Sequence, residues 1–360
     1  TRLVTLSATA GSGTSFFQSY EYSPYEPGLS QFAAMTFVLG TGVAGATVDC
    51  GYFDANNGVI FRQNGATNLQ FILRTSTSGS VSDANIVDQS SWNIDKLDGT
   101  GASGLTLDVT KAQILVIDLQ FLGMGRVRIG FDIDGVIYYA HEFLNANNLS
   151  VPYMQTATLP ICMLITATAT GSTKTSSFKC AAVQSESGNL DHTGFVFSTP
   201  ETTATAGSGT RTPLLAIRPK TTFNSITNRS LFQALSMSLI VTGANNVYWE
   251  LVIGGAYSGQ TYADVNTTFS AYEYTSVPGT YTNLTGGIVI ASGYAGQTGG
   301  GAGGVSTANT INIPALSSLK YPIALNRAGA VRALGTLTLL VTGIGGTSAC
   351  RGSLNFKEIR

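Results

Sequence analysis

The segment 113–143 constrains the fold most strongly, because it has the pattern of an antiparallel β meander. An apolar run rich in β-branched residues is followed by a stretch in which charged and apolar residues alternate. Such alternation places every second side chain on the same face of a strand. Asp134-Gly135 then predicts a two-residue hairpin turn that leads the chain back. The expected inward set is Val127, Ile129 and Phe131, and the expected outward set is Arg126, Arg128 and Asp132.

The composition extends this all-β prediction to the whole chain. Hydrophobic residues make up 43% of the 360 residues, which is enough to fill substantial cores. Charged residues make up only 11%, against about 25% in an average soluble protein. No segment has the periodicity of an amphipathic helix. We therefore predict two tandem antiparallel β-sandwiches with many short strands and tight turns.

The domain limits follow from changes in composition along the chain. Residues 199–210 contain no large apolar residue, which is typical of a linker. We expect a first β-sandwich at 1–198 and a second at 211–360. Within the second, the segment 286–304 contains nine glycines and is expected to form a loop, either flexible or held by a neighbouring subunit. A polar stretch at 76–90 is expected to be a surface loop.

The net charge of −1 gives no indication of a nucleic-acid partner. Its distribution is uneven, since residues 1–200 carry 15 acidic and 9 basic side chains, and 201–360 carry 5 and 10. Such opposite balances allow two halves, or two subunits, to attract each other, although two separate domains would account for them equally well. No apolar run is long enough to span a membrane, so no membrane insertion is expected.

The four cysteines form no C-x-x-C pair, which argues against a zinc site. Each lies beside residues typical of strands, so we expect buried free thiols. A disulfide between Cys162 and Cys180, across neighbouring strands, is the alternative.

Three sets of residues suggest catalysis or metal binding, and each has a structural explanation. Asp132, Asp134 and Glu142 would suit a glycosidase only if two carboxyl groups faced one groove. His141 and His192 lack an accompanying G-x-S-x-G nucleophile motif. Oxygen ligands for Ca²⁺ are offered by Asp54, Asn56 and Asn57, but an Asx-rich turn explains the same residues. We therefore predict no enzyme activity, no cofactor and no catalytic residue.

Aromatic side chains offer a further kind of site, because ring faces stack on the apolar faces of sugars. Core or interface packing is the competing explanation for each. The residues that we consider as saccharide-binding candidates are Trp92, Tyr138, Tyr139 and Tyr272.

The meander also carries a family resemblance. The sequences WNIDKLDGTGASGLTLD, GRVRIGFDIDG and HEFLNANN, together with the earlier GYFDANNGVIF, resemble virion structural proteins of tailed bacteriophages. Those proteins are similar to the laminin-G and concanavalin-like jelly roll. The resemblance is strongest over residues 51–153, and it implies a jelly-roll scaffold for the first sandwich. The sequence departs from the family pattern at ICMLI, where a more polar strand is expected.

This resemblance implies a location in the virion and a non-enzymatic structural role. The protein would be an exposed decoration or fibre-like component of the head or tail, contributing to host attachment. Its partners would be copies of itself, with a trimer as the first expectation, other virion proteins and a host-surface saccharide. Two alternatives remain open: a glycan-binding lectin module or depolymerase that acts on the host envelope, and a passive capsid cement protein.

Overall fold

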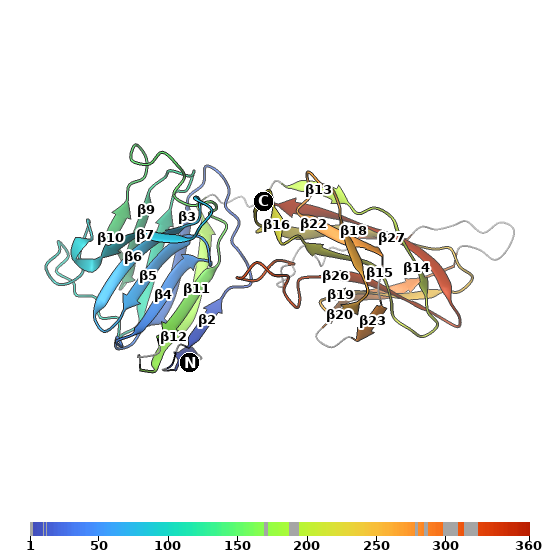
Figure 1. Cartoon of the computed structure of the whole chain (residues 1–360), viewed down its shortest axis with the longest axis horizontal. Helices are drawn as coiled ribbons and strands as arrows, with labels where there is room; N and C mark the ends of the chain where they lie inside the picture. The colour runs from blue at the N-terminus through green and yellow to red at the C-terminus, as the bar shows by residue number, and fades with distance from the viewer. Residues whose placement is uncertain are drawn as a thin grey trace. The chain divides into compact units, whose positions relative to one another are not determined.

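A computed structural model of the chain divides into two compact units, Thr1–Asp191 and His192–Arg360 (Figure 1). Nearly all regular structure in the described part is β-strand, and the exception is one 3-10 turn, η1 (Gln89–Ser91). The structure describes residues 3–9, 11, 13–168, 172–186, 194–277, 280–283, 287–297, 309–312 and 323–360.

Unit 1 is a sandwich of two six-stranded antiparallel sheets. Sheet A has the order β1 (Val4–Ala8), β12 (Lys174–Ser185), β3 (Gln31–Val38), β8 (Gln113–Leu119), β9 (Val127–Ile133) and β10 (Val136–Phe143). Sheet B has the order β2 (Thr14–Gln18), β11 (Ile161–Ala167), β4 (Ala46–Phe53), β5 (Gly58–Asn64), β6 (Asn68–Thr75) and β7 (Ser82–Asp88). The consecutive strands β4 to β7 lie in one sheet and β8 to β10 in the other, as in a jelly roll. The concanavalin-like jelly roll predicted for this part of the chain is therefore confirmed at the level of fold.

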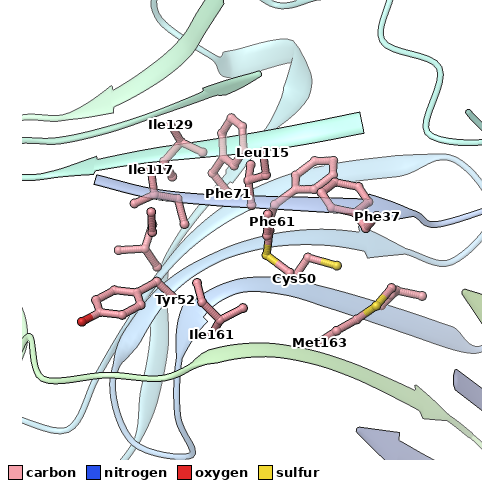
Figure 2. Packing of buried hydrophobic residues seen from close by; sticks show 14 of the residues in the cluster. Phe37, Cys50, Tyr52, Phe61, Phe71, Leu115, Ile117, Ile129, Ile161 and Met163 are labelled. Atoms are coloured by element: carbon pink, nitrogen blue, oxygen red, sulfur yellow. The ribbon is translucent and has the colours of Figure 1, made fainter. Parts of the chain in front are cut away.

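The core of unit 1 lies between these sheets, where both contribute alternate side chains. Figure 2 shows Phe37 and Leu115 from sheet A beside Phe61 and Phe71 from sheet B. The Phe61 ring centroid lies 5.9 Å from that of Phe37 and 5.5 Å from that of Phe71. The Phe37–Phe61 contact joins the two sheets, the Phe61–Phe71 contact joins neighbouring strands of sheet B, and both bury large apolar areas.

The predicted meander forms as expected. β8 pairs with β9 and β9 with β10, with Asp134 at a φ of 54° in the turn, where Gly135 follows at 84°. Val127, Ile129 and Phe131 are fully buried. Asp118 of β8 accepts hydrogen bonds from Arg128 on the outer face of sheet A. The inward and outward sets read from the sequence are therefore confirmed.

The prediction that the polar stretch 76–90 forms a loop is wrong for about half of these residues. Residues Ser82–Asp88 form β7, which pairs with β6 and makes one edge of sheet B. Only Ile86 and Val87 in this strand are large and apolar, so the pattern was too weak for sequence analysis. Backbone pairing to β6 determines the strand here, because one face of an edge strand can be polar.

Unit 2 is a second antiparallel sandwich, which confirms the predicted fold class. Its sheet C contains β13 (Phe195–Ser198), β14 (Thr202–Ala206), β27 (Ser348–Ile359), β18 (Leu231–Val241) and β25 (Asn309–Asn312). Sheet D has the order β21 (Thr261–Asp264), β22 (Tyr272–Val277), β15 (Thr212–Pro219), β26 (Leu337–Gly343), β19 (Val247–Ile253) and β24 (Ile288–Ala295). Two small hairpins complete the unit: β16 (Thr222–Phe223) with β17 (Ile226–Thr227), and β20 (Ala256–Ser258) with β23 (Thr280–Asn283).

Two expectations for this half of the chain need correction. The segment 199–210, predicted as a linker, contains β14, whose five residues all pair with β27. Small side chains such as those of Thr and Ala fit a strand whose backbone is fully paired, so their composition does not indicate a linker. Of the glycine-rich loop predicted at 286–304, residues Ile288–Ala295 form β24, which pairs with β19. Residues 286 and 298–304 lie outside the described residues.

All four cysteines are free. Cys50, Cys162 and Cys350 are buried, as predicted, whereas Cys180 is exposed on β12, so the burial predicted for that residue is wrong. The alternative Cys162–Cys180 disulfide is not formed, because both thiols are free and their strands, β11 and β12, are not neighbours in a sheet. Throughout the described ranges, no helix has the length and apolar character needed to cross a membrane.

Candidate functional site

The outer face of sheet B carries a row of polar side chains at matched positions of four neighbouring strands. The strand register places Asp49 of β4 opposite Arg62 of β5, Arg62 opposite Gln70 of β6, and Gln70 opposite Asp88 of β7. A second polar pair, Arg74 and Asp83, lies near the end of β6 and the start of β7. We call these six residues the polar face: Asp49, Arg62, Gln70, Arg74, Asp83 and Asp88.

Two bidentate ion pairs fix the orientation of the charged groups in the polar face. Arg62 Nε and Nη2 donate to the two Asp49 carboxylate oxygens at 2.6 and 2.8 Å. Arg74 donates in the same way to both oxygens of Asp83 at 2.8 and 2.9 Å, and Arg62 also reaches Asp83 at 3.5 Å. Hydrogen bonds to Asp49 raise the pKa of Arg62, and those from Arg74 lower the pKa of Asp83. Both shifts favour the charged forms of Arg62 and Asp83.

These ion pairs lie beside a small apolar cluster on the outer side of the sheet. Phe53, Ile60, Ile72 and Cys162 form a buried cluster separate from the main core. The register continues the apolar row from Ile60 through Ile72 to Ile86 on the edge strand. Arg74 lies over the Phe53 ring, with its guanidinium carbon 5.8 Å from the ring centroid. Because Ile86 remains 42% exposed, this row ends in an apolar surface next to the polar groups.

At the edge of the sheet, the polar face combines an exposed carboxylate with a buried amide. Gln70 and Asn68 donate to Asp88 Oδ1 at 2.8 and 3.0 Å, and these hydrogen bonds lower the pKa of Asp88. Gln70 is 7% exposed, and its carbonyl oxygen is a buried acceptor without a partner among the described residues. The side-chain amide of Gln70 is therefore oriented by the hydrogen bond that its nitrogen donates to Asp88.

The polar face therefore offers hydrogen-bond donors and acceptors that are held in place on rigid strands. The Arg62 and Arg74 side chains are 16% and 11% exposed, and Asp83 is 24% exposed, so only the edges of these groups reach solvent. Such an arrangement suits a ligand with many hydroxyl groups, because each hydroxyl both donates and accepts. The exposed Ile86 side chain adds an apolar contact beside them.

Replacing Asp49 by Asn should destabilise unit 1. Asp49 is almost fully buried and accepts two hydrogen bonds from a charged guanidinium. Losing such charge-assisted bonds is expected to lower the free energy of unfolding by about 1.5–3 kcal/mol. Urea titration followed by amide hydrogen exchange would measure this effect. As a matched control, Asp88→Asn alters an exposed carboxylate and should change stability little, and equal losses in both variants would contradict the interpretation.

Two of the four aromatic candidates are buried in cores. Trp92 is 3% exposed, and its ring stacks on that of Phe71 with centroids 4.2 Å apart. Tyr272 is fully buried, and its hydroxyl donates to the backbone oxygen of Ser230 at 3.1 Å. The prediction that Trp92 and Tyr272 bind a saccharide is therefore wrong, because no face of either ring is accessible in the folded units.

The remaining two aromatic candidates lie on opposite faces of β10. Tyr138 is paired with Phe131 and packs against the core of unit 1. Tyr139 is paired with Gly130 and lies half-buried on the outer face of sheet A. The Arg128 guanidinium carbon lies 4.2 Å from the centre of the Tyr139 ring and occupies one side of it. Of the four candidates, only Tyr139 lies on the outer face of a sheet, and its role in saccharide binding stays a prediction.

The acidic residues considered for catalysis are distributed over different positions of the meander. Asp132 accepts a hydrogen bond from the Gly135 N–H at 2.9 Å and thus stabilises the hairpin turn. Glu142 is paired with Arg128, and the Gly130–Tyr139 pair separates that row from the row of Asp132. The structure does not bring these carboxyl groups into one row.

Of the two histidines, the structure describes His141. His141 is buried, and its Nδ1 accepts the Asn93 N–H at 3.3 Å, so it is the structural histidine expected from the sequence. His192 lies outside the described residues.

The candidate calcium ligands form a turn. Asp54 Oδ1 accepts hydrogen bonds from the Asn56 and Asn57 backbone N–H groups at 2.7 and 2.9 Å. The Asn57 side-chain oxygen accepts the N–H groups of Ser76 and Gln155. These contacts support the turn explanation, with Asn57 linking three segments of the chain. In the part of the chain that the structure describes, no three His, Cys, Asp or Glu side chains gather as a metal-binding group.

Comparisons with known proteins give only distant similarities. No protein-family model and no curated protein sequence matches the chain. Similar solved structures include a legume lectin-like domain from Entamoeba histolytica, with 10% identity, a TM-score of 0.30 and coverage of 51% of this chain and 83% of that chain. The carbohydrate-binding module CBM66 from Bacillus subtilis has 15% identity and a TM-score of 0.27, with 49% and 85% covered. The homodimeric agglutinin CG-16 from chicken liver has 9% identity and a TM-score of 0.25, with 47% and 99% covered. At these values the similarities define neither a family nor a function.

Proposed function

We propose that unit 1 is a non-catalytic saccharide-binding domain and that its polar face is the binding site. The observation that carries this proposal is the fixed array of two guanidinium and three carboxylate groups beside the exposed Ile86 side chain. Saccharide sites combine a few fixed polar groups with an adjacent apolar surface.

The charges of the polar face indicate a neutral saccharide. Three carboxylates face two guanidinium groups, and each guanidinium already forms a bidentate ion pair. An acidic sugar would bring a further negative charge to a face with no unpaired cation, which like-charge repulsion disfavours. The accessible carboxylate of Asp88 can instead accept hydrogen bonds from sugar hydroxyls.

Binding to an array of immobilised neutral oligosaccharides, followed by calorimetric titration with a bound one, tests this proposal. Ile86→Ala and Asp88→Ala should each weaken binding at least about fivefold, which corresponds to about 1 kcal/mol. Ile137→Ala is the matched control, because it removes an equally exposed side chain from the edge strand of the opposite sheet. Wild-type affinity in both polar-face variants would refute the site. Release of new reducing ends from the bound saccharide would refute the non-enzymatic reading.

A more specific role is favoured by the resemblance of residues 51–153 to tailed-bacteriophage virion proteins. In that role, the protein is an exposed head or tail component that assembles with itself, as a trimer in the first instance, and with other virion proteins. Saccharide binding would then serve attachment to the host surface. Gold-labelled antibody on intact particles tests the location, and light scattering tests whether the mass is a multiple of 37.5 kDa. A monomer that fails to associate with particles would contradict this role and leave saccharide binding unaffected.

A further inference from the structure

A pair of tyrosines marks a second surface, on unit 2, that is independent of the polar face. Tyr248 of β19 and Tyr294 of β24 are directly paired across the two strands. Their ring centroids lie 5.3 Å apart, with the ring planes inclined at 51°. Tyr248 is half-buried, whereas Tyr294 is 75% exposed, the largest exposed fraction of any large hydrophobic side chain in the described residues. The two rings together form a small aromatic patch on the outer face of sheet D.

Packing in the core of unit 2 holds together the two strands that carry these rings. Trp249, next to Tyr248, points into the core of unit 2 and its ring lies over Gly293. A Cβ atom at position 293 would lie 2.8 Å from the Trp249 ring, so a glycine is needed where β24 passes this indole. The strand that carries Tyr294 is thereby held close to β19. The backbone positions of both tyrosines are therefore set by the pairing of β19 with β24.

A charged pair lies on the same face, next to the tyrosines. Glu250 is two residues after Tyr248 and therefore shares its side of the strand. It is 3% exposed, and Arg211 donates to its two carboxylate oxygens at 2.6 and 2.7 Å. The Arg211 side chain remains 37% exposed. Hydroxyl groups complete the surroundings, with Ser292 opposite Glu250 and Thr342 opposite Tyr248.

We propose that this face is a second saccharide-binding site, for a neutral chain of β-linked hexopyranose units. The tyrosine rings would stack on the apolar face of a pyranose, where ring hydrogens gather, and Arg211 would hydrogen-bond its hydroxyls. The strand register places Glu250, Ser292 and Thr342 next to the two rings, and such charged and hydroxyl groups suit a sugar, because they can hydrogen-bond its hydroxyls. A neutral sugar also needs no oppositely charged partner. This fits the site, because the charges of Arg211 and Glu250 are already paired with each other.

Calorimetric titration of the full chain with cellohexaose tests this second site. β-Linked glucose places all its hydroxyls at the ring edge and so exposes the most apolar pyranose faces. Tyr294→Ala should weaken cellohexaose binding two- to tenfold, and a Tyr248→Ala/Tyr294→Ala double variant should abolish it. Phe269→Ala is the matched control, since that ring is 64% exposed elsewhere on unit 2, and it should leave the affinity unchanged.

The outcomes separate this site from the polar face of unit 1. Ile86→Ala and Asp88→Ala should leave the binding heat that depends on Tyr294 intact, whatever they do to other saccharides. No binding of cellohexaose by the wild-type chain, or equal binding by the Tyr294→Ala variant, would overturn the second site. A smaller solution mass of Tyr294→Ala with unchanged cellohexaose binding would also overturn it, and would identify the face as a contact between copies of the chain.

Discussion

Replacing Phe131 by alanine is expected to lower the free energy of unfolding of unit 1 by about 3–5 kcal/mol. The Phe131 ring is fully buried and contacts two aromatic rings of the facing sheet, with centroid distances of 5.2 Å to Phe61 and 6.4 Å to Phe71. Alanine would remove these contacts and leave a cavity, because strands paired on both sides of β9 cannot move together to fill it. Chemical denaturation of the full chain, followed by hydrogen exchange of peptides from each unit, would measure the loss.

Two observations would show whether this loss has the proposed origin. Ile137→Ala removes an exposed side chain from the neighbouring strand and should change stability by less than about 1 kcal/mol. Peptides from β26 in unit 2 should keep their exchange rates in the Phe131→Ala protein. If Phe131→Ala cost no more than Ile137→Ala, the assignment of Phe131 to the core would be wrong.

Acidification should destabilise unit 1 through His141. Burial lowers the pKa of His141 to about 4, whereas an unfolded histidine has a pKa of about 6.5. The unfolded chain therefore binds the proton first as the pH falls, and stability decreases through this window. The difference corresponds to about 3 kcal/mol, which is present in full above pH 6.5 and lost by about pH 4.

Comparison of the pH dependence of unfolding in three proteins would test the role of His141. In a His141→Gln variant, the decrease in stability between pH 6.5 and 4 should be about 3 kcal/mol smaller than in the wild type, because glutamine does not titrate. Glutamine also keeps an acceptor for the Asn93 N–H group. His192→Gln leaves His141 in place and is the matched control, in which the part of the decrease caused by His141 should remain. Parallel curves for wild type and His141→Gln would exclude the buried histidine as the cause.

The strands with regular alternation could be predicted from the sequence, and the irregular ones could not. In β9, the inward residues Val127, Ile129 and Phe131 were clear because charged side chains separate them. β7 and β14 were missed because most of their side chains are small or polar, and pairing with β6 and β27 determines them. Such pairing depends on residues distant in sequence, which local composition does not reveal.

The same limit explains which parts of the two sites were missed. Trp92 and Tyr272 were selected because their rings could stack on a sugar, but their burial depends on how the sheets pack around them. Within the polar face, Asp49, Arg62 and Gln70 come from three different strands, and their alignment is visible only once the register is known. A sequence signal did exist for Asp49 and Gln70, since each is a polar residue with an apolar residue on either side. Tyr248 and Tyr294 are 46 positions apart, so their pairing had no such signal.

The position of β27 in sheet C has a consequence for synthesis on the ribosome. β27 pairs with β18 on one side and with β13 and β14 on the other, so it joins strands made long before it. β13, β14 and β18 can pair with β27 only after residues 348–359 have left the exit tunnel. The strands of unit 1 are all complete by residue 185, so that unit can fold while unit 2 is still being made. Nascent chains should therefore gain protease resistance in two separate steps, the second only after β27 emerges.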